Sequence, residues 1–324
     1  MNLINDPDTQ RAACTALDAL LEILHDNIEQ YLQLIMEKLA GLLENAPLSV
    51  KAVLTGAIGS AAHASKQSFL PYFPPTINRL AHFLTLTGEG GEIELRGIAM
   101  DAIGTFSEAV GKERFRPYFP EMMNHAFSGL DMGSARLREC SFLFFGVMAR
   151  VFGEEFAPYL PQVMPSLLKS CKQLERGEDE DEGLSSLFLS LVLSFHQYTG
   201  VPITDITANF AGIDEIAELD TFLEVNSAIA IEKEIAADTM GTLFASTQIH
   251  FLAYVEPCTL ELIQLLSHYY EGIRRSAIDS LLEIVRTFYD ISDHEEWVPG
   301  ANAVSETDLR SHIALLMVFD RFPL

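Results

Sequence analysis

The amino-acid sequence predicts an all-α fold, a right-handed α-solenoid in which antiparallel helix pairs stack side by side. Two recurring marks predict it. The first is an aromatic–proline motif, Phe-x-Pro-Tyr-(Phe/Leu)-Pro, which stands in full at 69–74, 115–120 and 156–161, with weaker copies around Tyr31 and Tyr254. The second is a basic residue followed eight positions later by a glycine: Lys51/Gly59, Arg96/Gly104, Arg138/Gly146 and Lys233/Gly241. Each basic residue precedes the next motif tyrosine by 21 or 22 residues, so the two marks are in phase and indicate one repeating unit.

Composition favours a folded, acidic protein with basic partners. The chain has 324 residues, of which 48% are hydrophobic and 21% charged, which suits a continuous core. Its net charge of −25 argues against direct binding to nucleic acid. The same charge favours basic proteins, whose approach such a field accelerates by roughly 10- to 1000-fold at low salt. The alternative is that the acidity only keeps the protein soluble.

The four cysteines lie apart, without the spacing of a metal site or a disulfide framework. Three of them fall in apolar helical patterns, so we expect small core residues in a reducing compartment. The first residues lack the basic and apolar runs of a signal peptide. The apolar stretch 184–195 is too short to span a bilayer. These features predict a soluble intracellular protein with no membrane insertion.

Apolar residues with helical spacing arrange most of the chain in pairs of helices. Residues 8–25 predict one amphipathic helix that carries a basic residue but has no helix before it, so we expect a fragment that starts in the middle of a repeat. The unit after Tyr72 predicts a first helix over 74–86, a glycine-rich loop and a second helix over 92–110. The same plan recurs over 31–64, 118–152 and 254–289.

The array is expected to cover residues 1–300 with about six repeats, the first one truncated. Residues 301–324 lack both marks and form an atypical tail, in which 309–319 has the composition of one more short helix. The last repeat also departs from the pattern, because Leu282 stands eight positions after Arg274 in place of glycine. Glycine inside a helix costs about 1 kcal/mol relative to alanine. Its recurrence at one phase therefore predicts close approach of neighbouring helices.

One unit is longer than the others. The step from the tyrosine to the next basic residue is 20 or 24 residues elsewhere, but 74 from Tyr159 to Lys233. We predict an acidic insertion over 175–224 between the two helices of one repeat; the alternative is an extra repeat that has lost both marks. The opening run 175–182 is expected to stay mobile because like charges repel. The stretch 184–211 is either a packed helix or sequence foreign to the array.

Acidic residues recur on the predicted second helices, which line the concave wall of such an array. Asp101, Asp238 and Asp279 each stand five positions after the basic residue of their repeat. Glu94, Asp101 and Glu108 are seven residues apart and therefore share one helix face. Together these residues predict an acidic surface for an extended Lys/Arg-rich segment. For any single carboxylate, a solvated helix face is the alternative.

The other recurring residues are predicted to be structural. We expect the basic residues to bond to acidic or carbonyl groups of adjacent repeats rather than to form an anion site. The motif tyrosines are expected to pack between units, and Trp297 to fill a loop rather than to anchor a partner. The chain contains no HExxH, Cys/His cluster, phosphate loop or GxSxG motif. We therefore expect no catalytic residues, no metal, no cofactor and no enzymatic activity.

Helix pairs at this period are typical of HEAT and armadillo arrays. The Pro-Tyr-Phe-Pro motif before the first helix, the long acidic loop inside one repeat and the run 225–237 (VNSAIAIEKEIAA) resemble the importin-β (karyopherin-β) superfamily of nuclear transport receptors, in its importin-four-like branch. The resemblance covers roughly residues 8–183 and 221–300. It implies a HEAT-repeat solenoid, here a central segment of a longer receptor, located in the cytoplasm and nucleus and at the nuclear pore.

The resemblance also implies partners. In this family the acidic loop contacts the GTPase Ran or basic cargo, which assigns partner binding to Glu178, Asp179, Glu180, Asp181 and Glu182. The implied partners are basic cargo such as histones and ribosomal proteins, Ran, and nucleoporins with Phe-Gly repeats, with cargo released by Ran-GTP. The alternative is a HEAT-repeat scaffold subunit of another class, in a phosphatase or chromatin-associated complex.

Overall fold

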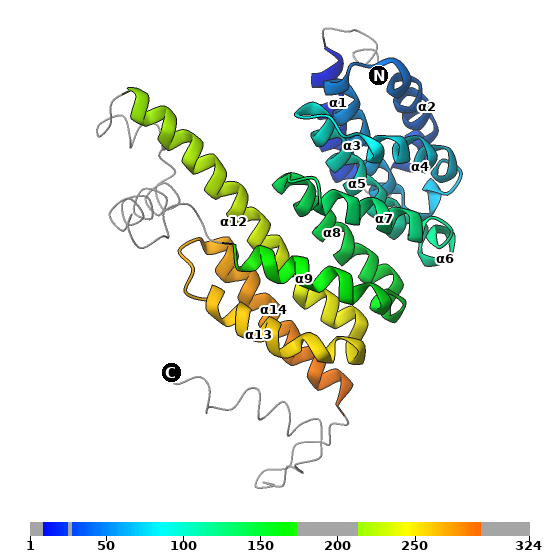
Figure 1. The fold of residues 1–324 in the computed structure, drawn as a ribbon. Helices are drawn as coiled ribbons and strands as arrows, with labels where there is room; N and C mark the ends of the chain where they lie inside the picture. Colours follow the sequence, from blue (N-terminus) through cyan, green and yellow to red (C-terminus); the bar gives the residue numbers. More distant parts are fainter. Residues whose placement is uncertain (1–8, 25–27, 174–212, 293–324) are drawn as a thin grey trace. The chain divides into compact units, whose positions relative to one another are not determined.

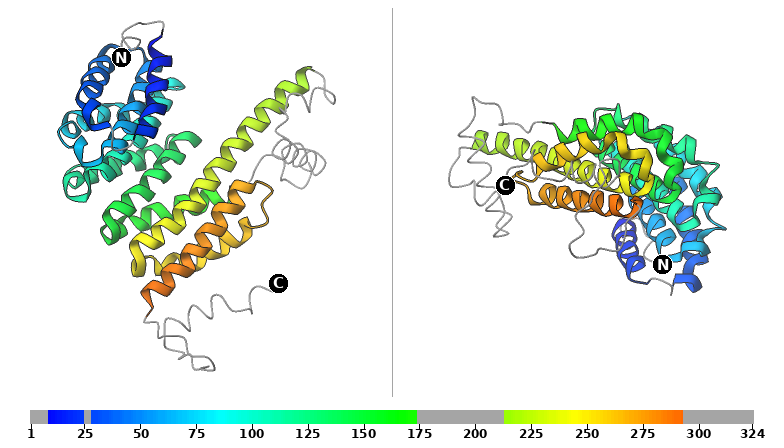
Figure 2. Two further views of the ribbon diagram at one scale, coloured as in Figure 1. Left: turned by 180° about the vertical axis from the view of Figure 1, so that it is seen from behind. Right: turned by 90° about the horizontal axis from the view of Figure 1, so that it is seen from below.

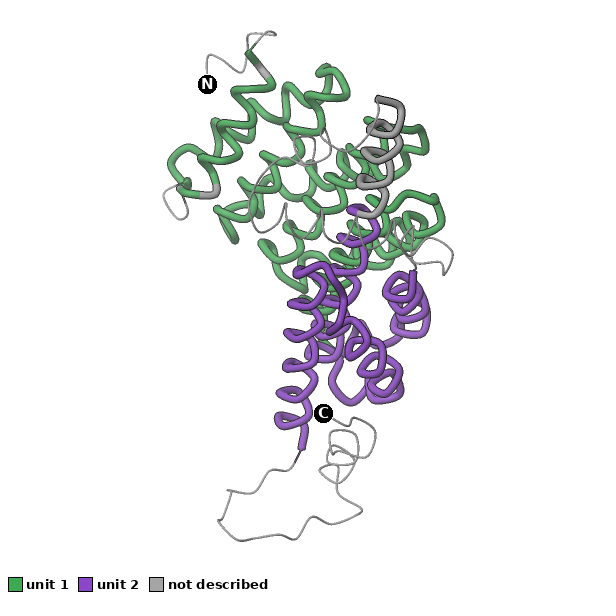
Figure 3. Tube along the Cα trace, turned by 90° about the vertical axis from the view of Figure 1, so that its left-hand side faces the viewer, with its two compact units in different colours: residues 1–153 green, residues 154–324 purple. Residues whose placement is uncertain are grey.

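The computed structural model describes residues 9–24, 28–173 and 213–292. Every regular element in these ranges is a helix (Figure 1). The chain divides into two compact units, residues 1–153 and 154–324 (Figure 3). Both units are built from helical hairpins, each consisting of a first helix and a second helix.

The first unit begins with α1 (Gln10–Leu24) and continues with hairpins. Their first helices are α2 (Glu29–Asn45), α4 (Phe73–Ala81) and α7 (Phe119–Leu130). Their second helices are α3 (Leu48–Ser65), α5 (Gly91–Val110) and α8 (Ala135–Phe152). Short turns flank them: η3 (Lys66–Phe69), η4 (His82–Thr85) and α6 (Lys112–Phe115). The predicted boundaries of α1 and α5 therefore agree with the structure to within two residues.

These helices of the first unit form two layers. α1 packs against α3, α3 against α5 and α5 against α8, so the second helices make a continuous layer. The first helices α2, α4 and α7 each pack on the second helix of their own hairpin. The core lies between the layers, and its largest buried side chains are Arg96 and phenylalanines of the aromatic–proline motif and of the second helices.

In the second unit, η5 (Gly153–Tyr159) leads into α9 (Leu160–Cys171), and η6 (Gln248–Phe251) leads into α13 (Leu252–Leu265). The second helices are α12 (Ile213–Thr247) and α14 (Glu271–Ile291), which lie side by side (Figure 2). The backbone of 213–224, which the sequence assigns to the acidic insertion, is the start of α12. The runs 178–182 and 184–211, Trp297 and the tail 301–324 lie outside the described residues.

The aromatic–proline motif forms the start of each first helix. Its leading phenylalanine is fully buried at 69, 115, 156 and 251. A proline occupies the first turn of α4, α7 and α9, where its missing N–H leaves no hydrogen bond unmade. The ring of Tyr118 packs edge-on against Phe73 of the preceding hairpin, at 5.3 Å between centroids. The predicted packing role of the motif tyrosines is thus confirmed at Tyr118.

The prediction that the basic residues bond to groups of adjacent repeats is confirmed for Arg96, whereas Arg274 bonds to carbonyl groups of its own hairpin. Arg96 is 2% exposed. Its guanidinium donates to the carbonyl oxygen of Leu86 at 2.9 Å, and on α7 to the hydroxyl of Ser128 at 2.9 Å and the carbonyl oxygen of His125 at 3.4 Å. Arg274 donates to two carbonyl oxygens in the loop of its own hairpin. Arg96 therefore joins two successive hairpins, whereas Arg274 closes one.

Polar bonds between second helices follow the repeat length. Ser60 donates to Asp18, Arg150 to Glu108, and Ser280 to the carbonyl oxygen of Asp238, each pair 42 residues apart. Equivalent positions of successive repeats therefore lie side by side, which makes neighbouring second helices parallel. The four cysteines are buried and free, which confirms them as core residues. None of the described helices has the length and apolar character needed to cross a membrane.

Candidate functional site

The predicted acidic face of α5 exists in the first unit. Glu94, Asp101 and Glu108 follow one another along one side of the helix, with side chains 52%, 39% and 41% exposed. The remaining length of α5 is mostly buried, from Leu95 to Val110. Together with Glu92 in the first turn, these three carboxylates are the charged groups that α5 presents to solvent.

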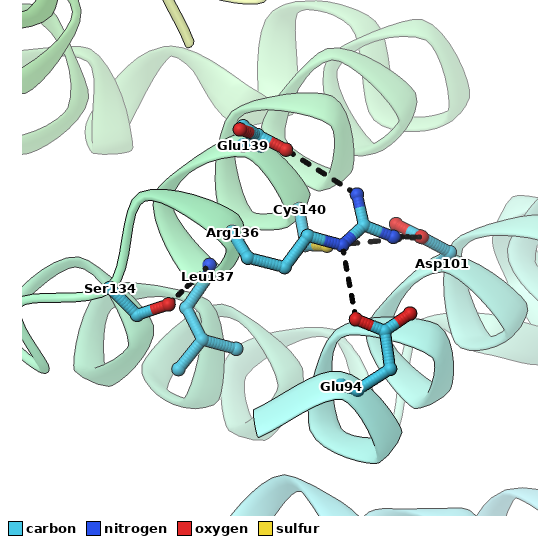
Figure 4. Close-up of polar contacts among 7 residues, drawn as sticks. All are labelled: Glu94, Asp101, Ser134, Arg136, Leu137, Glu139 and Cys140. Carbon is cyan, nitrogen blue, oxygen red and sulfur yellow. Dashed lines mark hydrogen bonds and ion pairs between the residues drawn. The ribbon is translucent and has the colours of Figure 1, made fainter. Parts of the chain in front are cut away.

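Arginines of α8 lie against these carboxylates. Figure 4 shows the Arg136 side chain extending from α8 toward Glu94 and Asp101, with its nitrogens 3.8 Å from the Glu94 carboxylate and 3.6 Å from the Asp101 carboxylate. A third nitrogen of Arg136 lies 3.4 Å from Glu139 on its own helix. Arg150 donates to Glu108 at 3.2 Å. These distances describe loose ion pairs, half-exposed except at the buried Glu139. An exposed pair of this kind contributes about 0–1 kcal/mol.

Local sequence places Arg136 in the first turn of α8. Gly133 adopts a φ of +72°, which suits glycine, and the turn it makes leads directly into the helix. The hydroxyl of Ser134 then accepts a hydrogen bond from the N–H of Leu137 at 3.4 Å and caps the helix (Figure 4). On the facing helix, Glu92 and Glu94 occupy the first turn of α5, where the helix dipole favours negative charge.

Burial changes the protonation chemistry of the cluster. Burial raises the pKa of Asp101 to about 6, and the charge of Arg136 opposes that rise. The thiol of Cys140 donates to Asp101 at a sulfur–oxygen distance of 3.8 Å, and burial raises the pKa of this thiol well above its usual range. Asp101 is therefore mostly ionised at pH 7 but loses its charge in mildly acidic solution.

The cluster keeps an excess of negative charge. Glu94, Asp101, Glu108 and Glu139 contribute four carboxylates, and Arg136 and Arg150 contribute two guanidinium groups. This arrangement suits an exposed cationic segment rather than an anion. Within the described ranges there is no group of three or more His, Cys, Asp or Glu residues that could hold a metal ion.

The second unit repeats the arrangement on α12 and α14. Asp238 is exposed on α12, and Asp279 is 60% exposed on α14. Burial raises the pKa of Glu234, one turn before Asp238; the charge of Asp238 adds to the rise and Arg275 of α14 opposes it. Arg275 also lies 3.9 Å from Asp279. Carboxylates of one second helix thus again have an arginine of the next second helix beside them.

The structure brings the predicted residues together within each unit, and it adds residues that the sequence reasoning missed. Glu94, Asp101 and Glu108 form one row in the first unit, and Asp238 and Asp279 lie on neighbouring helices in the second. The predicted loop residues 178–182 lie outside the described ranges. The missed residues are Arg136, Arg150 and Arg275. A signal for the first two was present, because they are 14 residues apart, the same spacing as Glu94 and Glu108.

Two families match this chain. The family described as importin subunit beta-1-like, TPR repeats, matches residues 2–201, and the family described as stalled ribosome sensor GCN1-like, HEAT repeats, matches residues 142–309. The "Probable importin subunit beta-4" of Schizosaccharomyces pombe is 39% identical over 292 residues, which are 90% of this chain and 26% of that protein. Importin-4 of Homo sapiens is 28% identical over 71% of this chain and 21% of that protein. The chain thus spans about a quarter of the length of these relatives.

Solved structures show the same fold. The chain is similar to Kap121p bound to Pho4p, with a TM-score of 0.64 and 20% identity over 88% of this chain and 26% of that chain. Kap121p bound to Nup53p gives a TM-score of 0.62 at the same identity and coverage. The predicted fold class, an all-α HEAT-repeat solenoid, is confirmed by these structures and by the match to HEAT repeats.

Proposed function

The chain belongs to the importin-β family of nuclear transport receptors and is importin-4-like, and on that premise we propose that it is a segment of an import receptor whose second helices hold a Lys/Arg-rich part of a cargo protein. Members of this family are transport receptors rather than enzymes. The chain spans about a quarter of the length of its relatives. Transport, cargo binding and cargo release are therefore proposed for a receptor that contains this segment.

The observation that carries the cargo proposal is the row of carboxylates along α5. Glu94, Asp101 and Glu108 span two heptads, about 21 Å of helix, which suits an extended basic segment rather than a single ion. Each exposed ion pair contributes about 0–1 kcal/mol, so affinity depends on several contacts and on the field of a chain with a net charge of −25. Asp238 and Asp279 extend the proposal to the second unit, and the acidic run 178–182 adds further negative charge.

The arginines of α8 compete with a cargo cation for the carboxylates of this surface. Arg136 already lies beside Glu94 and Asp101, at distances longer than a good charge-assisted hydrogen bond. An incoming lysine or arginine of the cargo exchanges with it for the same carboxylates. Cargo with several adjacent cations is favoured over a single charge, because one cation gains little from replacing another. Histones and ribosomal proteins have basic segments of this kind.

The remaining partners are proposed from the family. Kap121p is described bound to Pho4p and to Nup53p, which supports a protein cargo and a nucleoporin as partners here. We propose Phe-Gly nucleoporins as the route through the pore and Ran-GTP as the signal for cargo release. The receptor then shuttles between the cytoplasm and the nucleus through the nuclear pore.

The test is binding of a fluorescein-labelled, Lys/Arg-rich histone-tail peptide, followed by fluorescence anisotropy at several salt concentrations. The variants are Glu94→Lys/Glu108→Lys in the first unit and Asp238→Lys/Asp279→Lys in the second. A matched control, Glu37→Lys/Glu121→Lys, makes the same charge change on exposed positions of the first helices α2 and α7. We expect about tenfold weaker binding for the face variants, equivalent to about 1.4 kcal/mol, and less than twofold for the control. Equal losses in all three variants, or binding that is indifferent to salt, would contradict the proposal.

A second candidate is a HEAT-repeat scaffold subunit with no role in transport. The match of residues 142–309 to GCN1-like HEAT repeats favours it. Addition of GTP-locked Ran to the peptide complex separates the two candidates, since an import receptor releases the peptide and a scaffold retains it. The experiment is run in parallel on a longer chain that contains this segment.

A further inference from the structure

Arg136 of α8 has three carboxylate partners, two on the preceding second helix and one on its own helix (Figure 4). Its nitrogens lie 3.8 Å from Glu94 and 3.6 Å from Asp101, both on α5. A third nitrogen lies 3.4 Å from Glu139 on α8. The contact with Glu139 is the shortest of the three and the one that has hydrogen-bond geometry.

The surroundings of the three carboxylates decide which of them depends most on Arg136. Glu94 and Asp101 are half-exposed, so water solvates them if the guanidinium moves away. The side chain of Glu139 is only 8% exposed. Taking a cation from beside a buried carboxylate costs more than taking it from beside an exposed one. The contacts with α5 are therefore the ones that an incoming cation replaces most easily.

The path of the Arg136 side chain leaves it free to change partners. It crosses from α8 over Gly97 of α5, where an added Cβ would lie 3.8 Å from Nε and 4.0 Å from Cγ of Arg136. The same Cβ would lie 3.0 Å from the sulfur of Cys140. The space over Gly97 is thus filled by side chains of α8, and the aliphatic part of Arg136 lies on bare backbone of α5.

The contact with Glu139 does not depend on α5. Arg136 and Glu139 are three residues apart on α8, a spacing that makes their side chains neighbours on one helix face. The hydroxyl of Ser134 caps this first turn by accepting a hydrogen bond from the N–H of Leu137. The geometry that brings the guanidinium to Glu139 is therefore local to α8.

We propose that Glu139 is a positioning residue that retains Arg136 when a cargo cation takes the carboxylates of Glu94 and Asp101. This inference rests on the proposed cargo function of α5. Without cargo, the guanidinium of Arg136 joins α5 to α8. With cargo, it gives up the two exposed contacts and stays on α8 beside Glu139.

This exchange makes cargo binding depend on a residue that the cargo does not touch. Glu139 shares the guanidinium with α5 in the free protein and holds it alone in the complex. Its interaction with Arg136 is therefore stronger in the complex, which lowers the cost of displacing Arg136 from α5. The charge of Glu139 should then favour cargo binding only while Arg136 is present.

A double-mutant cycle with the fluorescein-labelled histone-tail peptide tests the proposal by fluorescence anisotropy. We expect Glu139→Gln to weaken peptide binding by about threefold in the parent chain and by less than about 1.5-fold in Arg136→Gln. The control Glu113→Gln removes the same charge from a carboxylate that pairs with Arg116, three residues away, and it should leave binding unchanged. Equal losses in both backgrounds, or no loss in the parent chain, would each overturn the proposal.

Nitrogen-15 NMR of the arginine side chains gives a second readout that needs no cargo. Glu94→Gln/Asp101→Asn removes the charges of α5 that cargo would neutralise. We expect the guanidinium of Arg136, assigned by its absence in Arg136→Gln, to keep restricted rotation in this variant and to rotate freely once Glu139→Gln is added. Free rotation already in Glu94→Gln/Asp101→Asn contradicts the proposal. A parent chain that does not bind the peptide counts against the cargo function alone, because the NMR outcome is independent of it.

Discussion

Replacing the repeat glycines by alanine should have opposite effects at two equivalent positions. Gly104 and Gly241 both stand eight residues after a basic residue and inside a second helix. Alanine in place of glycine stabilises a helix interior by about 1 kcal/mol. Any departure from that gain measures how closely the neighbouring helix approaches, which the sequence alone does not reveal.

The neighbouring atoms decide the sign at each position. At Gly104 the new Cβ would lie 3.6 Å from Phe144 and 3.7 Å from Val147, which is ordinary van der Waals contact. We expect Gly104→Ala to stabilise the first unit by about 0.5–1 kcal/mol. At Gly241 the new Cβ would lie 2.9 Å from the Cα of Ser280, so α12 and α14 must separate. Such overpacking costs about 1–3 kcal/mol.

A hydrogen bond adds to the cost at Gly241. The hydroxyl of Ser280 lies 2.6 Å from the position of the new Cβ and donates to the carbonyl oxygen of Ala237 at 2.7 Å. If the Ser280 hydroxyl is displaced, its hydrogen bond to the Ala237 carbonyl oxygen is weakened. The loss of a buried hydrogen bond of this kind costs about 1 kcal/mol of stability. The net expectation for Gly241→Ala is a destabilisation of the second unit by about 1–3 kcal/mol.

Hydrogen exchange measured separately for peptides of α5 and α12 reports the free energy of unfolding of each unit, and calorimetry reports the melting temperatures. For units of about 150 residues, 1 kcal/mol corresponds to a shift of about 2–4 °C. We expect the α5 amides to become more protected in Gly104→Ala and the α12 amides less protected in Gly241→Ala. The reasoning is refuted if Gly241→Ala stabilises its unit as much as Gly104→Ala does.

Three further outcomes follow from the polar contacts. Arg136→Gln should raise the affinity for a Lys/Arg-rich peptide by about 3- to 10-fold in the anisotropy assay, because it removes the built-in competitor; unchanged or weaker binding would contradict this. Burial raises the pKa of Asp101, so this group stabilises the first unit below pH 4, and the contribution is lost as the pH rises through about 6. For this half-exposed side chain the loss is at most about 1 kcal/mol. The free energy of unfolding, measured with urea between pH 4 and 7.5, should show this loss in the parent chain and not in Asp101→Asn. Arg96→Met should destabilise the first unit by about 2–4 kcal/mol in the same assay, because it leaves buried carbonyl and hydroxyl groups unpaired, whereas an effect below 0.5 kcal/mol would contradict that role.

Helix positions were predictable because they depend on local chemistry. The start of α5 was predicted within one residue, and Gly111 ends it with a φ of +80°. The first helix of that hairpin was predicted to reach residue 86, but α4 ends at Ala81 and continues as the 3₁₀ turn η4 to Thr85. The carbonyl oxygen of Leu86 beyond the turn accepts a hydrogen bond from Arg96. That tertiary contact is not visible in a local pattern.

Only the carboxylates of the candidate site were predictable from the sequence, and the arginines were not. Heptad spacing within one helix placed Glu94, Asp101 and Glu108 on one face, and the structure agrees. The arginines that face them were missed, because pairing across helices depends on the register between two helices rather than on either sequence. Once the register of 42 residues is known, Arg136 and Arg150 follow directly from Glu94 and Glu108.

The same register explains why the acidic surface is uneven. A carboxylate on one second helix lies beside the residue that stands about 42 positions later, on the next second helix. Asp18 meets the hydroxyl of Ser60, which leaves its charge intact, whereas Glu108 meets Arg150, which neutralises it in part. For the proposed cargo surface, this predicts that a cation gains most where the facing residue is uncharged or distant and least where an arginine already lies within hydrogen-bonding distance. We therefore expect the binding strength of the proposed surface to depend as much on the arginines of the following repeat as on the carboxylates themselves.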